Sequence, residues 1–278
     1  MTSIQPNKVT HFNMITTDAK QTVDHFRNVY DAEIITAGGE RHRDFDQSLF
    51  AFGGVMFEQF VPDLFFLHAK PGPQWYGMEH NCDLSVARKA VAERNIRITR
   101  DIAVAFHTNP QDHFGVPYEY YGGEFERNVY ATLGNRSMKP VSYWRDEHPS
   151  GLAGLKGYTV AVSAHEAIAA VHFYEDFFSA NRLYEKDRPE IGARAVGLHV
   201  ANGFVEILSP LGNGDGPIRR YLEWAGRGMY SLVMGARDID QLKKFLAGKK
   251  ITLGPGTAEN RWAAPAEANL GMVFEFER

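Results

Sequence analysis

Four residues of metal-ligating type stand on segments whose residue pattern is that of β-strands: His11, Glu58, His80 and Glu119. Two imidazoles with two carboxylates suit a borderline divalent cation such as zinc, nickel, manganese or ferrous iron. Glu58 is the most informative, because it lies in an apolar segment, and a buried carboxylate needs a cation or hydrogen-bond donors. We therefore expect one divalent metal ion to bind in the first half of the chain.

The two-residue period of a β-strand predicts which neighbours share a face with these candidate ligands. If the faces converge, the metal lies in a mostly apolar cleft with a few polar groups, which is typical of a small-molecule site. The residues expected to line this cleft and bind the substrate are Asn13, Met56, Phe60, Cys82 and Tyr121.

A β-α-β-β-β order of elements positions these residues. Apolar residues at helical spacing predict a helix over 18–30, which Asp18 can cap, and a more compressed unit of the same kind follows a break rich in proline and glycine at 70–74. The second unit has its helix at 86–94. The strands expected in the two units are 9–16, 33–37, 48–52 and 55–61, then 80–85, 96–105 and 117–121.

A similar order restarts in the second half of the chain. Glu58 and Glu206 occupy comparable places in the two halves, as do Glu119 and Glu275, which indicates a duplicated unit. The segment between the halves contains prolines and glycines and has no sustained periodicity. We expect a metal-binding N-terminal domain, a linker and a C-terminal domain at 1–134, 135–156 and 157–278.

The composition and charge exclude several classes of protein. The chain has 278 residues, of which 44% are hydrophobic and 23% charged, as in an ordinary globular protein. Its net charge of −4 offers no general attraction to nucleic acid or to an anionic membrane. One cysteine cannot form an internal disulfide, the polar start lacks the apolar core of a secretory signal, and the most apolar stretch is too short to span a bilayer. We expect a cytoplasmic protein whose partner is a small molecule.

The βαβββ units, the segment His11-Phe12-Asn13 and the segment 112–119 resemble the vicinal oxygen chelate superfamily. That superfamily includes glyoxalases, epimerases, fosfomycin-resistance enzymes and extradiol dioxygenases. The segment 112–119 is similar to its Asp-Pro-Asp-Gly turn before a metal-binding Glu, with His113 and Phe114 in place of the Pro and the second Asp. In the second half, residues 204–210 and 226–229 are similar to methylmalonyl-CoA epimerase. The resemblance implies an α+β glyoxalase/dioxygenase-like fold, with two domains of paired βαβββ modules.

The resemblance also implies which residues hold the metal. The glyoxalase-type pattern of His, Glu, His and Glu falls on His11, Glu58, His80 and Glu119. In the second half the two Glu positions fall on Glu206 and Glu275, but Gly or Tyr and Tyr or Ser stand at the His positions. We therefore expect the C-terminal domain to lack the site and to serve packing, substrate enclosure or formation of a homodimer. Hydrogen bonds from Tyr158 and Tyr230, or solvation, would then satisfy its carboxylates.

A divalent ion that chelates two neighbouring substrate oxygens stabilises developing enolate charge. With two carboxylates in the ligand set, one can loosen and move a proton, and Glu58 is our candidate for this catalytic role. The expected activity is therefore that of a metal-dependent isomerase, epimerase or lyase acting on a small, partly aromatic or apolar substrate.

Two alternatives stay open. One is an Fe(II)-dependent extradiol-type ring-cleaving dioxygenase with a facial triad of His11, His80 and Glu119. Against it, such enzymes carry their site in the C-terminal half and have a Tyr where Asn109 stands; His107 or His113 would have to serve as acid or base, although loop histidines are usually solvated. The other alternative is a metal-free ligand-sequestering protein of the antibiotic-resistance type, which would not require the four ligand-type residues.

Overall fold

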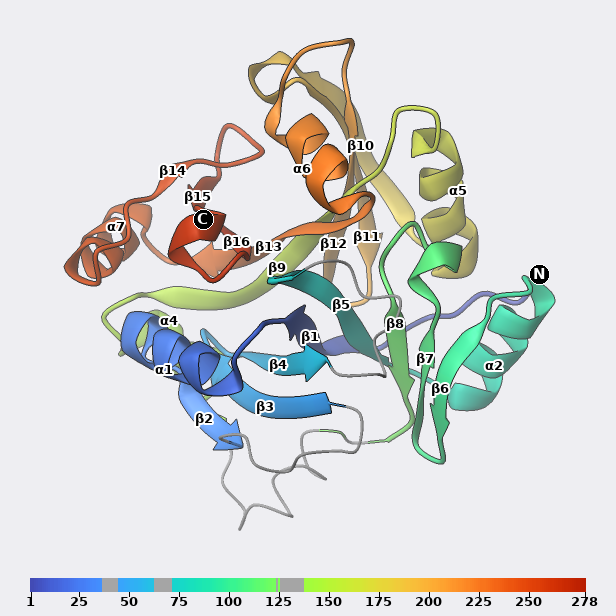
Figure 1. The fold of residues 1–278 in the computed structure, drawn as a ribbon, viewed down its shortest axis with the longest axis horizontal. Coiled ribbons are helices and arrows are strands. Elements are labelled where there is room, and N and C mark those ends of the chain that lie inside the picture. Colours follow the sequence, from blue (N-terminus) through green and yellow to red (C-terminus); the bar gives the residue numbers. More distant parts are fainter. Residues whose placement is uncertain (37–44, 63–71, 124, 126–137) are drawn as a thin grey trace. The chain divides into compact units, whose positions relative to one another are not determined.

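The computed structural model describes residues 1–36, 45–62, 72–123, 125 and 138–278. Each half of the sequence forms one mixed eight-stranded sheet, curled and accompanied by a few helices, so the chain has an α+β fold (Figure 1). The predicted fold class of repeated βαβββ modules is confirmed.

The first sheet has the strand order β2-β3-β4-β1-β5-β8-β7-β6. Its first module follows the predicted order with small shifts of boundary, and Asp18 caps α1 by accepting a hydrogen bond from the backbone of Gln21. The elements of the two modules are β1 (Lys8–Ile15), α1 (Ala19–Tyr30), β2 (Glu33–Thr36), β3 (Phe45–Phe52) and β4 (Val55–Pro62), then β5 (Gln74–Asn81), α2 (Leu84–Glu93), β6 (Ile98–Ile102), β7 (Ala105–Thr108), η1 (Pro110–Asp112) and β8 (Tyr118–Tyr121).

Two predictions in the second module were wrong. The strand expected at 80–85 is β5, which begins earlier and ends at Asn81, because Asp83 caps α2 through the backbone N–H groups of Ser85 and Val86. The single strand expected at 96–105 is the hairpin β6-β7, which turns at residues 103–104. That turn contains alanine and valine and none of the residues that usually mark a tight hairpin.

The second sheet has the order β10-β11-β12-β9-β13-β16-β15-β14. Helix α4 (Val141–Asp146) and the start of β9 lie within the segment predicted as a linker, and Trp144 of α4 is buried. The elements that follow are β9 (Leu152–Ala161), α5 (Ala167–Phe177), β10 (Asn181–Arg188), η2 (Pro189–Ile191), β11 (Ala193–Val200), β12 (Gly203–Pro210), α6 (Pro217–Ala225), β13 (Gly228–Ala236), α7 (Ile239–Gly248), β14 (Gly254–Pro255), β15 (Trp262–Ala264), η3 (Ala266–Ala268) and β16 (Val273–Glu277).

Contacts divide the chain into two compact units, and each unit takes parts from both halves of the sequence. The first unit comprises residues 1–10, 77–126 and 157–230, and the second comprises residues 11–76, 127–156 and 231–278. Strands β1, β5, β9 and β13 each contribute residues to both units. Each sheet comes from one half of the sequence, whereas the contact units combine modules from both halves.

Aromatic side chains form much of the core of the second unit. The ring of Phe26 on α1 stacks on Phe50 and Phe52 of β3, and Tyr30 stacks on Phe52. In the first unit, α5 lies beside strands β10 and β11 and contacts β11 and β12 (Figure 1). Helix α1 also contacts β4, the strand that carries Glu58.

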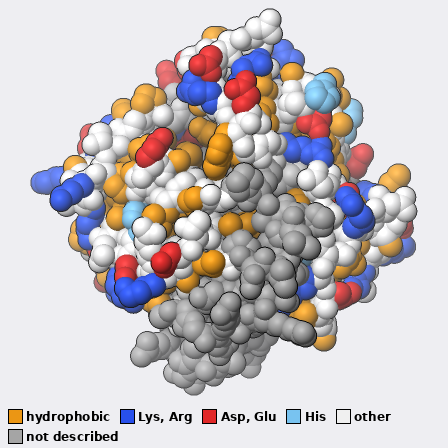
Figure 2. Space-filling view, viewed as in Figure 1, with side chains coloured by type: hydrophobic (Ala, Val, Ile, Leu, Met, Phe, Trp, Pro, Cys, Tyr) orange, Lys and Arg blue, Asp and Glu red, His pale blue; other side chains and the backbone are white. Residues whose placement is uncertain are grey.

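Surface charge is mixed on the face shown in Figure 2, where Lys and Arg side chains are interspersed with Asp and Glu. This distribution fits the small net charge and gives no single-sign field on that face. Among the helices that the structure describes, none is long and apolar enough to cross a membrane.

Candidate metal centre

In the first unit, three ligand-type side chains lie on one row of neighbouring strands. Glu79 on β5 is paired in register with Glu119 on β8, and Glu119 is paired with His107 on β7. Residues paired in this way point to the same face of a sheet. His107 Nε2 lies 3.0 Å from Glu119 Oε1, and the Thr10 hydroxyl donates a hydrogen bond to Glu79. The row therefore brings two carboxylates and an imidazole together.

The burial of this row indicates a cation site. Glu79 is fully buried and Glu119 is 7% exposed. Like charges directly opposite each other destabilise a sheet, and a buried carboxylate is costly unless it is paired or binds a metal. Carboxylate oxygens with an imidazole nitrogen are ligands that divalent metals accept. The residues present thus fit a divalent ion.

The structure places His80 on the opposite face of β5. His80 is paired with Tyr120, and its ring lies against Tyr118, Tyr120 and Phe178. Burial lowers the pKa of His80 to about 3, so the imidazole is neutral at pH 7. The structure does not bring His80 beside Glu119, and Glu79 occupies that position instead. Sequence reasoning missed Glu79 because the two residues are adjacent, and a shift of one residue exchanges the faces of a strand.

In the second unit, His11 and Glu58 are in contact. His11 Nε2 lies 3.1 Å from Glu58 Oε2, and both side chains are buried or nearly so. The parallel pairing of β1 with β4 matches His11 with Met56 and Asn13 with Glu58. It also matches the last residue of β1 with Phe60. As predicted, His11 and Asn13 share a face of β1, and Met56, Glu58 and Phe60 share a face of β4; the strand pairing puts both sets on one face of the sheet.

The two remaining substrate-binding candidates lie in the first unit. Tyr121 is two residues from Glu119 on β8 and so shares its face; its ring contacts Phe125. Cys82 lies just beyond the end of β5, where its backbone N–H donates to the carbonyl of Tyr121. Burial is the largest cause that raises the pKa of the Cys82 thiol to about 12, so the thiol stays protonated at pH 7.

The expectation that His107 and His113 are solvated loop residues was wrong. His107 lies on β7 and is 4% exposed. His113 is fully buried against the rings of Tyr118, Phe173 and Phe177, and burial lowers its pKa to about 4. The sequence Ala105-Phe106-His107-Thr108 has no apolar–polar alternation that would have identified His107.

In the second half of the chain, arginines neutralise the two carboxylates at the duplicated positions. In the first unit, Glu206 accepts hydrogen bonds from both terminal nitrogens of Arg188 and from the Tyr184 hydroxyl. In the second unit, Glu275 accepts hydrogen bonds from Thr257 and lies 3.6 Å from an Arg261 nitrogen. The expectation named Tyr158, Tyr230 or solvation as the source of these contacts and did not foresee the two arginines.

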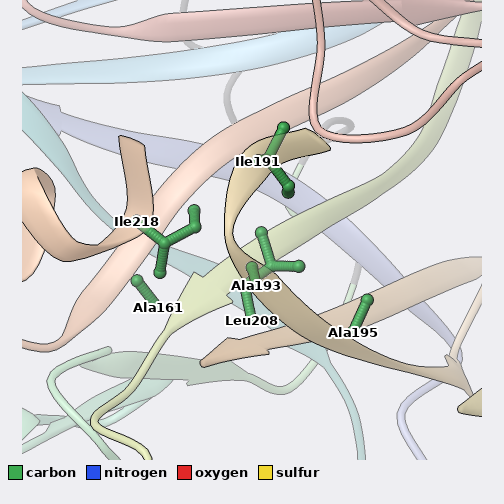
Figure 3. Close-up of a cluster of buried hydrophobic side chains, with 6 residues drawn as sticks. All are labelled: Ala161, Ile191, Ala193, Ala195, Leu208 and Ile218. Atoms are coloured by element: carbon green, nitrogen blue, oxygen red, sulfur yellow. The ribbon is translucent and has the colours of Figure 1, made fainter. Parts of the chain in front are cut away.

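Helix α6 also fills the sheet face that carries Glu206. Ile218 of α6 packs in a buried cluster on β9, β11 and β12, and Tyr221, Leu222 and Tyr230 pack against the cluster. The cluster comprises Ala161, Ile191, Ala193, Ala195, Leu208 and Ile218 (Figure 3). Within the part of the chain that the structure describes, no group of three metal-ligating side chains lies in the second half. Side chains of α6 therefore pack on the sheet face that carries Glu206.

No protein-family model and no curated protein matches the sequence. Among solved structures, a triple mutant of 4-hydroxymandelate synthase from Streptomyces coelicolor aligns over 98% of this chain and 92% of its own, with a TM-score of 0.75 and 11% identity. A xylose isomerase-like TIM barrel/4-hydroxyphenylpyruvate dioxygenase fusion protein aligns over 99% of this chain and 49% of its own, with a TM-score of 0.67 and 12% identity. The two eight-stranded sheets and these similarities show that the chain has a glyoxalase/dioxygenase-like fold.

Proposed function

We propose that the protein is a divalent-metal-dependent enzyme that moves a proton next to a carbonyl group of a small substrate. The observation that carries the proposal is the register pairing of two buried carboxylates, Glu79 and Glu119, in line with His107. A cation relieves the repulsion between two such carboxylates, and an enzyme that binds a divalent cation there can use it as a Lewis acid.

The proposed ligands are Glu79 and Glu119, with His11 as the third. Each of the three is buried and offers one ligand atom. The chain itself supports the inclusion of His11, because His11 follows Thr10 directly and the Thr10 hydroxyl bonds to Glu79. A bound divalent ion would supply Lewis-acid stabilisation of the negative charge that develops on a substrate oxygen. The carboxylate-rich set favours manganese among the metals considered above.

Glu58 is the proposed acid–base residue. Its carboxylate contacts His11 and shares a face with Asn13, Met56 and Phe60, so polar and apolar groups surround it. Glu58 would take a proton from a carbon next to a carbonyl group. Returning that proton to the other face of the same carbon is epimerisation, and returning it to a neighbouring atom is isomerisation. The Asn13 amide would orient the substrate through a hydrogen bond, and Met56 and Phe60 would contact its apolar part.

The reaction class is tested by solvent exchange under anaerobic conditions. Metal-loaded protein in deuterium oxide is incubated with a panel of 2-hydroxy ketones, 2-oxo acids and aryl-substituted analogues, and deuterium at carbon is followed by NMR. We expect incorporation for part of the panel and none with Glu58→Gln. Oxygen consumption by the ferrous protein with catechols, without exchange, would support the dioxygenase alternative instead. A purified protein that binds members of the panel but no metal would support sequestration.

A further inference from the structure

The first unit contains a cavity on strands of the second sheet, and none of the candidate metal ligands lines it. It has a volume of about 500 Å³ and is lined by residues of α5, β10, β11 and β12. That volume falls in the range of about 300 to 1,000 Å³ that is typical of small-molecule sites. The lining residues are Ala164, Ala167, Ile168, Val171, His172, Arg182, Glu185, Arg194, Val196, Ile207, Ser209, Pro210 and Leu211.

Strand alternation shows that this cavity is distinct from the packed face of the same sheet. Arg194 and Val196 line the cavity, whereas Ala193 and Ala195 between and beside them belong to the buried cluster of Figure 3. On β12, likewise, Ile207 alternates with Glu206 and the cluster residue that follows. The cavity therefore opens on the side of the sheet that α5 covers.

The floor of the cavity is apolar. Val171 of α5 and Val196 and Ile207 of the sheet are buried, and Ile168 at the edge of the cavity is 72% exposed. An apolar ligand body in this cavity would remove its own hydrocarbon surface from water, together with exposed surface of Ile168. The floor therefore favours a ligand with a hydrophobic or aromatic part.

The wall carries two guanidinium groups that share a carboxylate. Glu185 lies 3.1 Å from Arg182 and 3.9 Å from Arg194. Two acids outside the cavity also pair with these arginines. Arg182 Nε lies 3.0 Å from Glu175 Oε1, and Arg194 Nε lies 2.9 Å from Asp187 Oδ1. These contacts orient both guanidiniums but use only part of their donors, because each guanidinium has five N–H groups.

We propose that this cavity binds a small apolar or aromatic monocarboxylate. Its hydrocarbon part would lie on the floor of Val171, Val196 and Ile207, and its carboxylate would accept hydrogen bonds from Arg182 and Arg194. Guanidinium groups match carboxylates in charge and in planar geometry, and the outside partners lower the entropy cost of fixing them. The inference is independent of the proposed metal chemistry.

The test is a titration of the full chain with 2-naphthoate, followed by ligand fluorescence and by calorimetry, with and without a chelator. We expect saturable 1:1 binding that the chelator leaves unchanged, which separates this cavity from the metal centre. Ala167→Phe, which fills the cavity from the half-buried side of α5, should weaken binding about tenfold or more. Arg194→Gln should weaken it about tenfold through loss of a charged hydrogen bond.

Matched variants outside the cavity serve as controls. Ala169→Phe changes an exposed alanine of the same helix, and Arg88→Gln changes a half-buried arginine that is likewise paired with an acid. Both should bind 2-naphthoate like the original protein. Equal binding by Ala167→Phe and Ala169→Phe would overturn the site, as would the absence of saturable binding. Equal affinity for 2-naphthylmethanol, which lacks the carboxylate, would overturn the ligand class.

Discussion

Glu79 and Glu119 are directly paired across β5 and β8, and both carboxylates are buried. Two negative groups in this position destabilise the fold unless a cation or a proton lies with them. This relationship supports the proposed metal site better than any single residue does, because two carboxylates face each other there.

The first prediction concerns stability without metal. Glu79→Gln removes one of the paired charges, so the chelated protein should gain about 1 kcal/mol of unfolding free energy. The same variant should lose the stabilisation that added metal gives the original protein. Thermal melts with chelator and with added Mn²⁺ measure both effects. A variant that is still stabilised by metal as strongly as the original protein would contradict the assignment of Glu79.

The second prediction concerns the buried ion pair of the first unit. Arg188→Met leaves Glu206 without its cation in a fully buried position and should cost about 3 to 5 kcal/mol. The double variant Arg188→Met/Glu206→Leu should recover most of that loss, since it buries no lone charge. Urea unfolding gives the free energy of unfolding of the original protein, the single variant and the double variant. Arg88→Met, at the exposed ion pair with Asp101, is the control and should change stability by at most about 1 kcal/mol. Equal effects at the two arginines would be inconsistent with a buried charge at Glu206.

The third prediction assigns the proton transfer. Glu58→Gln should lower turnover about 10²- to 10⁴-fold, because the amide cannot accept the proton. Its metal content should stay near that of the original protein, since His11, Glu79 and Glu119 remain. Turnover and metal content are measured on the same preparation. Unchanged turnover would exclude Glu58 as the base, whereas loss of the metal would make it chiefly a ligand.

The fourth prediction concerns acid stability. Burial lowers the pKa of His113 to about 4, below its unfolded value of 6.5. The unfolded chain therefore binds the proton first, and stability from this group, present above pH 6.5, is lost as the pH falls toward 4. The loss amounts to about 3 kcal/mol. His113→Phe keeps an aromatic ring among its neighbours. Between pH 7 and pH 4, its free energy of unfolding should fall by about 3 kcal/mol less than that of the original protein, as measured by urea unfolding. Identical pH slopes for both proteins would contradict this account.

Much of the fold could be predicted from the sequence, because apolar periodicity and helix caps such as Asp18 act locally. The sharing of a face by His11 and Asn13, and by Met56 and Glu58, also follows from alternation once the strands are known. The choice between Glu79 and His80 could not be predicted, since adjacent residues of a strand differ only in face. The partner of Glu206 could not be predicted either, because Arg188 reaches it across β11.

The central claim is that Glu79 and Glu119 bind a divalent metal ion. The most direct test is the metal content of four purified proteins, measured by inductively coupled plasma mass spectrometry. They are the original protein, Glu79→Gln, Glu119→Gln and His80→Gln, each checked for native secondary structure by circular dichroism. We expect one divalent ion per chain in the original protein and in His80→Gln, and a loss of the ion in both glutamate variants. Retention of the ion by Glu79→Gln together with its loss from His80→Gln would contradict the proposed metal centre.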